Sequence, residues 1–262
     1  PNRLEVLVRD ASSAAISSVP VTFSVSSPTP TLGARATPES AQTNLDGTAG
    51  TVFKVGSLPL EYQVTCNCPS CGPVGSSVTF SACGKLGTDE FRQGDVRWST
   101  TTLGNHPPDN SIKKVGCALS SVANLINFYN TASSSPIRTD PFQLNEDMME
   151  HGGYNDADNV RWSEVVNFIE PEITWISDRE IGPETNRVDL MSDIDTDVAQ
   201  GYPVIVQGER PPAGSGNYHF MLVVGRCGGQ YIVADPALST GRRLYDPNEI
   251  NLPLRGIHRY AP

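Results

Sequence analysis

The chain of 262 residues is long enough for one large domain or two modest ones. Hydrophobic residues make up 38% of it and charged residues 18%, which excludes a disordered chain and a coiled coil. Its 19 basic and 29 acidic side chains give a net charge of −10, which argues against binding to nucleic acid or to anionic lipid. No apolar run of about 18 residues or more predicts a membrane-spanning helix. Because the chain begins with Pro1 rather than Met, we interpret it as a segment of a longer precursor.

The composition changes near residue 84. Residues 1–84 hold 4 Lys and Arg and 5 Asp and Glu, so the remainder holds 15 (19 − 4) and 24 (29 − 5), and the net charges are −1 and −9. The first segment is rich in Ser and Thr and contains no His, whereas all 4 His and all 3 Trp lie in the second. The sequence therefore predicts one domain over residues 1–84 and a second domain over residues 85–262.

The first segment shows short alternating runs and no helical period. The expected strands cover residues 4–8, 19–25, 50–56, 60–66 and 76–82, and turn-forming Gly, Pro, Asn and Asp separate them. This pattern is typical of an antiparallel β-sandwich. The runs LEVLVRD, VPVTFSV, TNLDGTAG and YQVTC resemble the bacterial immunoglobulin-like repeats of invasin and intimin type. The resemblance implies a spacer or adhesive module on an extracellular or bacterial cell-surface protein, with a surface ligand as its partner.

Four cysteines belong to this first segment. Cys66, Cys68 and Cys71 crowd one turn, and Cys83 closes the next expected strand. Bridged Cα atoms must approach within about 7 Å, so Cys66–Cys71 or Cys68–Cys71 is easier to build than Cys66–Cys83. A zinc site is the alternative, but the extracellular appearance of the domain favours disulfides.

In the second segment, residues 117–129 follow a helical period, and Gly116 precedes them. Cys117 would then open the helix. The unpaired N–H groups and partial positive charge of a helix N-terminus lower the pKa of a thiol there and favour the reactive thiolate. The alternative is that Cys117 is a small buried hydrophobic residue.

Residues 219–225 and 230–235 read as two strands of a hairpin. A loop of three or five residues would place His219 directly opposite Asp235, whereas a loop of four would send the two side chains to opposite faces. A facing carboxylate can hold the imidazole in one tautomer. Taken singly, His219 can be a core histidine, and Asp235 a turn residue before Pro236. With Cys117, they supply the nucleophile, base and orienting group of thiol catalysis.

The runs IKKVGCALSSVANLINFY, VRWSEVV, GYPVIVQ, HFMLVVGR and YIVADPA resemble the C39-like, papain-type cysteine peptidase family over about residues 91–240. The resemblance implies a papain-like α+β fold with Cys117 as nucleophile, His219 as base and Asp235 as orienting carboxylate. It also implies an oxyanion-hole glutamine. The stretch just before Cys117 contains none, so Gln93 in FRQGDVRW is the candidate, although 23 residues separate it from Cys117.

The expected activity is hydrolysis of a peptide or protein substrate through an acyl-enzyme, with no metal or organic cofactor. Three alternatives stay open: an acyl transferase with the same triad, an inactive surface-binding module, and an adhesin whose main role lies in the first domain.

Two other groups receive simpler interpretations. We expect Asp193, Asp195 and Asp197 to form a solvated helix face rather than a calcium site. His258 has no acidic residue at the spacing that separates His219 from Asp235.

Overall fold

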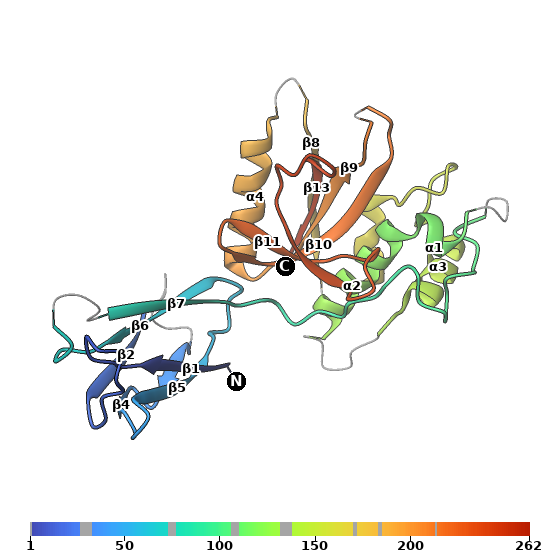
Figure 1. Ribbon diagram of the computed structural model, residues 1–262. Helices are drawn as coiled ribbons and strands as arrows, with labels where there is room; N and C mark the ends of the chain where they lie inside the picture. The colour runs from blue at the N-terminus through green and yellow to red at the C-terminus, as the bar shows by residue number, and fades with distance from the viewer. Residues whose placement is uncertain are drawn as a thin grey trace. The chain divides into compact units, whose positions relative to one another are not determined.

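The computed structural model describes residues 2–26, 33–72, 77–105, 110–131, 138–169, 172–182, 185–212 and 214–262. The chain divides into two compact units, Pro1–Gly84 and Lys85–Pro262 (Figure 1). Within these ranges, no helix is long and apolar enough to cross a membrane. His106 lies outside the described residues.

Strands are the only regular secondary structure among the described residues of the first unit. They are β1 Asn2–Leu7, β2 Pro20–Ser26, β3 Arg35–Thr37, β4 Ser40–Gln42, β5 Thr48–Lys54, β6 Glu61–Asn67 and β7 Ser77–Cys83. They form two antiparallel sheets, of order β1-β5-β3 and β4-β2-β6-β7. The five predicted strands are present. The prediction missed β3 and β4, because three residues are too few to show an alternating pattern.

The two sheets of this unit share one apolar core. From the larger sheet, Phe23 of β2 and Tyr62 and Val64 of β6 are buried, and from the smaller sheet Phe53 of β5 joins them. The rings of Phe53 and Tyr62 meet edge to face with their centroids 6.3 Å apart. Each such side chain contributes roughly 1.5–3 kcal/mol when it is fully buried, so this contact between the sheets stabilises the unit.

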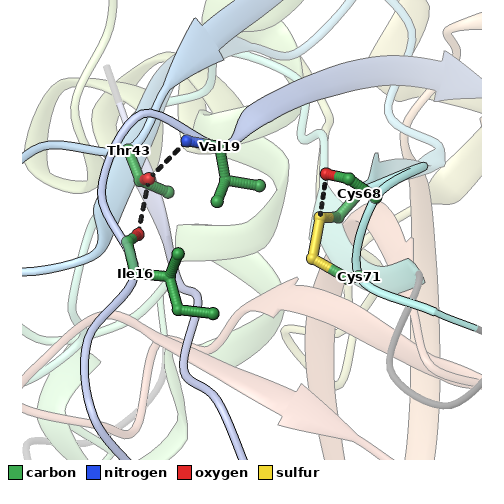
Figure 2. Close-up of a disulfide and its surroundings, with 6 residues drawn as sticks. Ile16, Val19, Thr43, Cys68 and Cys71 are labelled. Atoms are coloured by element: carbon green, nitrogen blue, oxygen red, sulfur yellow. Dashed lines mark hydrogen bonds between the residues drawn. A yellow bond between two sulfur atoms is a disulfide. The ribbon is translucent and has the colours of Figure 1, made fainter.

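The cysteine-rich turn carries a disulfide between Cys68 and Cys71, whose Cα atoms are 5.4 Å apart (Figure 2). It is one of the two pairings that the spacing favours. Cys66 is a free thiol inside the core, where burial raises its pKa. The part of the chain that the structure describes holds no cluster of His, Cys, Asp and Glu able to bind a metal ion, so the zinc alternative has no support. Beside this region, the Thr43 hydroxyl donates to the Ile16 carbonyl at 2.7 Å (Figure 2).

The second unit combines one sheet with several helices. The helices are α1 Ile112–Val115, α2 Cys117–Asn130, α3 Pro141–Glu150, the 3-10 helix η1 Trp162–Phe168, and α4 Arg187–Gln200. The strands are β8 Thr174–Glu180, β9 Val204–Glu209, β10 Tyr218–Cys227, β11 Gln230–Ala234, β12 Arg242–Tyr245 and β13 Leu254–Ala261. They form a six-stranded antiparallel sheet of order β12-β11-β10-β9-β13-β8.

The central strands of this sheet are buried on both faces. On β9, every residue from Val204 to Glu209 is buried. Alternate residues of β9 and β10, among them Val206 and Val223, pack with Leu190 and Ile194 of α4 in one apolar cluster. Figure 1 shows α4 on one side of the strands and α2 on the other. The helices therefore enclose the middle of the sheet and hold β10 in place.

Side-chain hydrogen bonds fix α2 against the sheet. The Ser121 hydroxyl donates to the Phe220 carbonyl of β10 at 3.2 Å, and the Tyr129 hydroxyl donates to the Tyr260 carbonyl of β13 at 2.7 Å. Both bonds lie on the buried side of the helix. They place the N-terminus of α2 beside the start of β10.

The loop of the β10–β11 hairpin has two residues, fewer than the three to five residues that the sequence suggests. Cys227 pairs with Gln230, so Gly228 and Gly229 alone make the turn. Their φ angles are +58° and +82°, the left-handed conformation that two-residue hairpin turns require and that glycine adopts without penalty.

A β-bulge between Val223 and Gly225 then changes the register of this hairpin. Without the bulge, the two-residue turn would direct Asp235 to the opposite face of the sheet from His219. The bulge shifts the pairing by one residue, so Asp235 continues the register opposite Met221, two residues from His219 and on the same face. The prediction that His219 faces Asp235 directly is therefore wrong in register, while the side chains still share a face as diagonal neighbours.

The left-handed conformation of this turn can be tested by substitution. Gly229→Val would force a β-branched residue into the left-handed conformation, and we expect the free energy of unfolding to fall by about 1–2 kcal/mol in urea denaturation. A Cβ at Gly229 would meet nothing within 4 Å, so the loss would be conformational rather than steric. Gly228→Asn is the control, since asparagine is favoured at that position of such turns. Equal losses in the two variants would contradict the explanation.

Candidate active site

Cys117 is the first residue of α2, directly after the break between α1 and α2. The break occurs at Gly116, where a Cβ would lie 2.5 Å from the Ile112 carbonyl oxygen. Only glycine fits this approach, which explains why the chain has no side chain immediately before the cysteine. Cys117 is 8% exposed and lines a cleft of about 480 Å³ in the second unit.

The surroundings of Cys117 favour its thiolate. Burial by itself would raise the pKa of the thiol, but the interaction with the His219 ring and the nearby backbone N–H groups together outweigh burial and lower it. The backbone N–H groups of Phe220 and Ala118 lower the pKa, as expected at a helix N-terminus. The sequence-based expectation of a helix N-terminus therefore holds, and the larger favourable contribution comes from His219.

His219 is the second residue of β10 and is 2% exposed. Its Nε2 lies 2.7 Å from Oδ1 of Asp235, which is 3% exposed. Its Nδ1 is buried without a hydrogen-bond partner among the described residues, so this nitrogen is available to Cys117. Burial disfavours the imidazolium, but the hydrogen bond with Asp235 and the interaction with the Cys117 thiol overcome this and raise the pKa of His219 to about 9. The ring therefore sits between an acid and a thiol, with one nitrogen for each.

Asp235 has three hydrogen-bond donors around it. Its Oδ1 also accepts from the Ala237 N–H at 3.0 Å, and its Oδ2 accepts from Nε of Arg243 at 3.0 Å. Burial would raise the pKa of Asp235, but its bond with His219, followed by smaller contributions that include Arg243, lowers it. The carboxylate is therefore ionised although it is buried. The contact of Arg243 with Asp235 has no signal in the sequence, because nothing in the local pattern links β12 to the end of β11.

Gln93 lines the same cleft as Cys117, although it is distant in sequence. Its backbone N–H donates to the Pro236 carbonyl at 3.0 Å, and its side-chain Nε2 donates to the Lys113 carbonyl at 2.6 Å. The Trp98 indole donates to the Arg92 carbonyl at 2.8 Å and secures this loop. An amide nitrogen carries two hydrogens, so Nε2 of Gln93 retains one donor after its bond with Lys113.

The cleft wall also contains aromatic groups that the sequence did not assign to it. Trp162 lines the cleft and stacks on His258 with ring centroids 3.6 Å apart. Nδ1 of His258 lies 2.8 Å from Oδ1 of Asp178, its partner on the neighbouring strand β8. His258 thus has an acidic partner, at a separation that the hairpin spacing does not reveal, because strand pairing joins residues that are 80 positions apart. Burial lowers the pKa of His258 despite this contact.

Three of the four aspartates of α4, Asp193, Asp195 and Asp197, are occupied by ion pairs. Asp197 accepts from Nε and Nη2 of Arg259 at 2.7 and 2.8 Å, and Asp193 forms an ion pair with Nη1 of the same arginine at 3.1 Å. Asp195 pairs with Arg226. The expectation of a solvated face is therefore wrong: these side chains bind arginines of β10 and β13 and anchor α4 to the sheet.

A model of the Peptidase_C39 like family matches residues 98–252, more than half of the chain. The matched region contains Cys117, His219 and Asp235, and it begins after Gln93. No curated protein and no solved structure matches the chain.

The geometry predicts how His219 titrates. Asp235→Asn removes a bond and a charge that raise the pKa of His219, while burial remains, so we expect that pKa to fall well below about 9. Histidine ring signals followed by NMR across pH, with His219→Ala for assignment, would measure the change. Glu150→Gln, on the exposed end of α3, is the charge-matched control. A His219 titration that is the same in the Asp235 variant and the wild type would show that the carboxylate does not control the ring.

Proposed function

Because the chain belongs to the Peptidase_C39 like family, we propose that it is a cysteine peptidase or a related amide hydrolase that works through Cys117, His219 and Asp235. The observation that carries this proposal is the position of the His219 ring. It bonds Asp235 through Nε2, and its interaction with Cys117 lowers the pKa of the thiol at the head of α2. This is the arrangement of nucleophile, base and orienting group that thiol catalysis needs.

In the proposed reaction, Nδ1 of His219 takes the proton of Cys117, and the thiolate sulfur bonds to the carbonyl carbon of an amide. The carbonyl electrons move to oxygen, where the backbone N–H of Cys117 and the remaining Nε2 hydrogen of Gln93 stabilise the oxyanion. When the C–N bond breaks, His219 gives its proton to the leaving amine, and a thioester remains on Cys117. His219 then takes a proton from water, the hydroxide attacks the thioester, and the acid product leaves as the Cys117 thiol is regained. Asp235 stabilises the imidazolium at each stage.

The same proposal covers the wider architecture. A helix that begins at Cys117 packs against an antiparallel sheet that carries His219, and this arrangement supports a papain-like α+β fold. For the first unit, the two facing sheets and the Ser- and Thr-rich composition support an immunoglobulin-like domain. We propose that it is a spacer or adhesive module of a secreted or bacterial surface protein, which is a setting where disulfides such as Cys68–Cys71 persist.

The first test of the proposal is alkylation of Cys117. We expect iodoacetamide to label Cys117 rapidly and well below pH 8.5, the usual pKa of a cysteine thiol, because His219 lowers the pKa of this one. Peptide mapping of the intact chain from pH 4 to 9 would measure it. His219→Ala should remove the low-pH labelling, and His151→Ala, at an exposed position on the end of α3, should not. An ordinary thiol profile in the wild type, unaffected by His219→Ala, would mean that the groups do not act together.

A second prediction separates the oxyanion role of Gln93 from the state of the thiol. Loss of one oxyanion donor costs about 10²–10³ in kcat, so we expect Gln93→Ala to lower amide hydrolysis by about that factor. Alkylation of Cys117 forms no oxyanion, and its rate should stay within about threefold. Gln143→Ala, exposed on α3, is the control. If both rates fell equally, Gln93 would act on the thiol itself.

Product analysis with added amines would show whether water or an amine resolves the thioester.

A further inference from the structure

We propose that Arg243 is a positioning residue for the reaction at Cys117, because it holds the Asp235 carboxylate in the orientation that His219 needs. The inference deepens the proposed function, on which it rests, by adding a residue of β12 to the site.

The contacts of Asp235 divide between its two oxygens. Oδ1 accepts from His219 Nε2 and from the Ala237 N–H, and Oδ2 accepts from Arg243 Nε at 3.0 Å. A carboxylate on one χ2 bond can rotate and exchange its oxygens. The bond from Arg243 to Oδ2 opposes that rotation, so Oδ1 stays directed at His219.

Arg243 is itself held in place. Its Nη1 and Nη2 donate to the two carboxylate oxygens of Glu249 at 3.0 and 2.8 Å, and its guanidinium lies 5.3 Å from the centre of the Tyr245 ring. All three nitrogens therefore have partners, and the planar group spans Asp235 and Glu249. A lysine would keep the charge but would lack the rigid fork that reaches both carboxylates.

The strand supplies a matched control. Arg243 pairs with Val233 on β11, and adjacent side chains of a strand point to opposite faces. Arg242 therefore points away from Asp235, and its guanidinium lies 3.5 Å from Glu90, nearly half exposed. The two arginines share a strand and a charge, but only Arg243 contacts the site.

The charge arrangement predicts a pH effect. Two ionisable groups contact Asp235 directly: His219, which interacts with Cys117, and Arg243, which is bonded to Glu249. Arg210 lines the same pocket as Asp235. Arg243 is one of the causes that lower the pKa of Asp235. Its removal would leave two carboxylates without their cation, so Asp235 would take up a proton at higher pH. His219 would then lose its ionised partner at higher pH, and the acid limb of Cys117 reactivity would shift upward.

The experiment compares Arg243→Gln, Arg243→Lys and Arg242→Gln in the intact chain. One readout is the rate of Cys117 alkylation across pH. The other is the downfield proton NMR signal of the His219 Nε2–H bonded to Asp235, assigned by its loss in His219→Ala. We expect Arg243→Gln to slow alkylation near pH 7 by roughly tenfold, the size of one charge-assisted hydrogen bond, to shift the acid limb to higher pH, and to broaden the signal. Arg243→Lys keeps the charge, so the acid limb should return close to its wild-type pH, while the rate should recover little because the fork is lost. Arg242→Gln should match the wild type in both readouts.

An unchanged rate, acid limb and proton signal in Arg243→Gln would overturn the proposal. If that variant failed to fold, Glu249→Gln, which loosens the guanidinium but keeps its charge beside Asp235, should slow alkylation and broaden the proton signal to a smaller extent, without the upward shift of the acid limb. An unchanged rate and signal would again overturn the proposal. The NMR readout does not depend on catalysis. An Arg243-dependent signal beside an ordinary thiol profile in the wild type would therefore support the positioning role while contradicting the proposed peptidase.

Discussion

The hydrogen bond between Nε2 of His219 and Oδ1 of Asp235 depends on one extra residue in a β-ladder. The two-glycine turn would direct the acid to the wrong face, and the bulge between Val223 and Gly225 returns it to the side of the histidine. Because β10 is covered by helices on both sides, this register cannot slip without exposing apolar side chains. The packing of the sheet thus preserves a contact between the start of β10 and the end of β11.

Burial gives this contact its chemical effect. His219 and Asp235 are almost inaccessible to solvent, and a buried charge is costly unless it is paired. Asp235 is paired with His219 and Arg243, and Arg243 is also paired with Glu249. The charges alternate along the series from Cys117 to Glu249, so each ion is stabilised by the next. The same desolvation that makes an isolated ion unfavourable strengthens the buried pair of His219 and Asp235.

The residues of the site come from segments that are far apart in the chain. Cys117 heads a helix, His219 begins a strand, Asp235 ends the next strand, and Gln93 reaches the cleft from a loop tied by its backbone to Pro236. Each segment is simple, and their convergence depends on the packing of α2 on β10. The aromatic wall of the cleft, with Trp162 on a buried histidine, follows from the same packing.

The sequence by itself determined the features that depend on nearby residues. These are the helix that opens at Cys117, most strand positions of the first unit, the two strands of the hairpin, and the short list of disulfide pairings, because period and spacing are local properties. Only the tertiary structure decided the pairing of His258 with Asp178, the contact of Arg243 with Asp235, and the register of the hairpin. Such contacts join strands whose pairing depends on the packing of the whole sheet, and a bulge that changes that pairing leaves no periodic mark in the sequence.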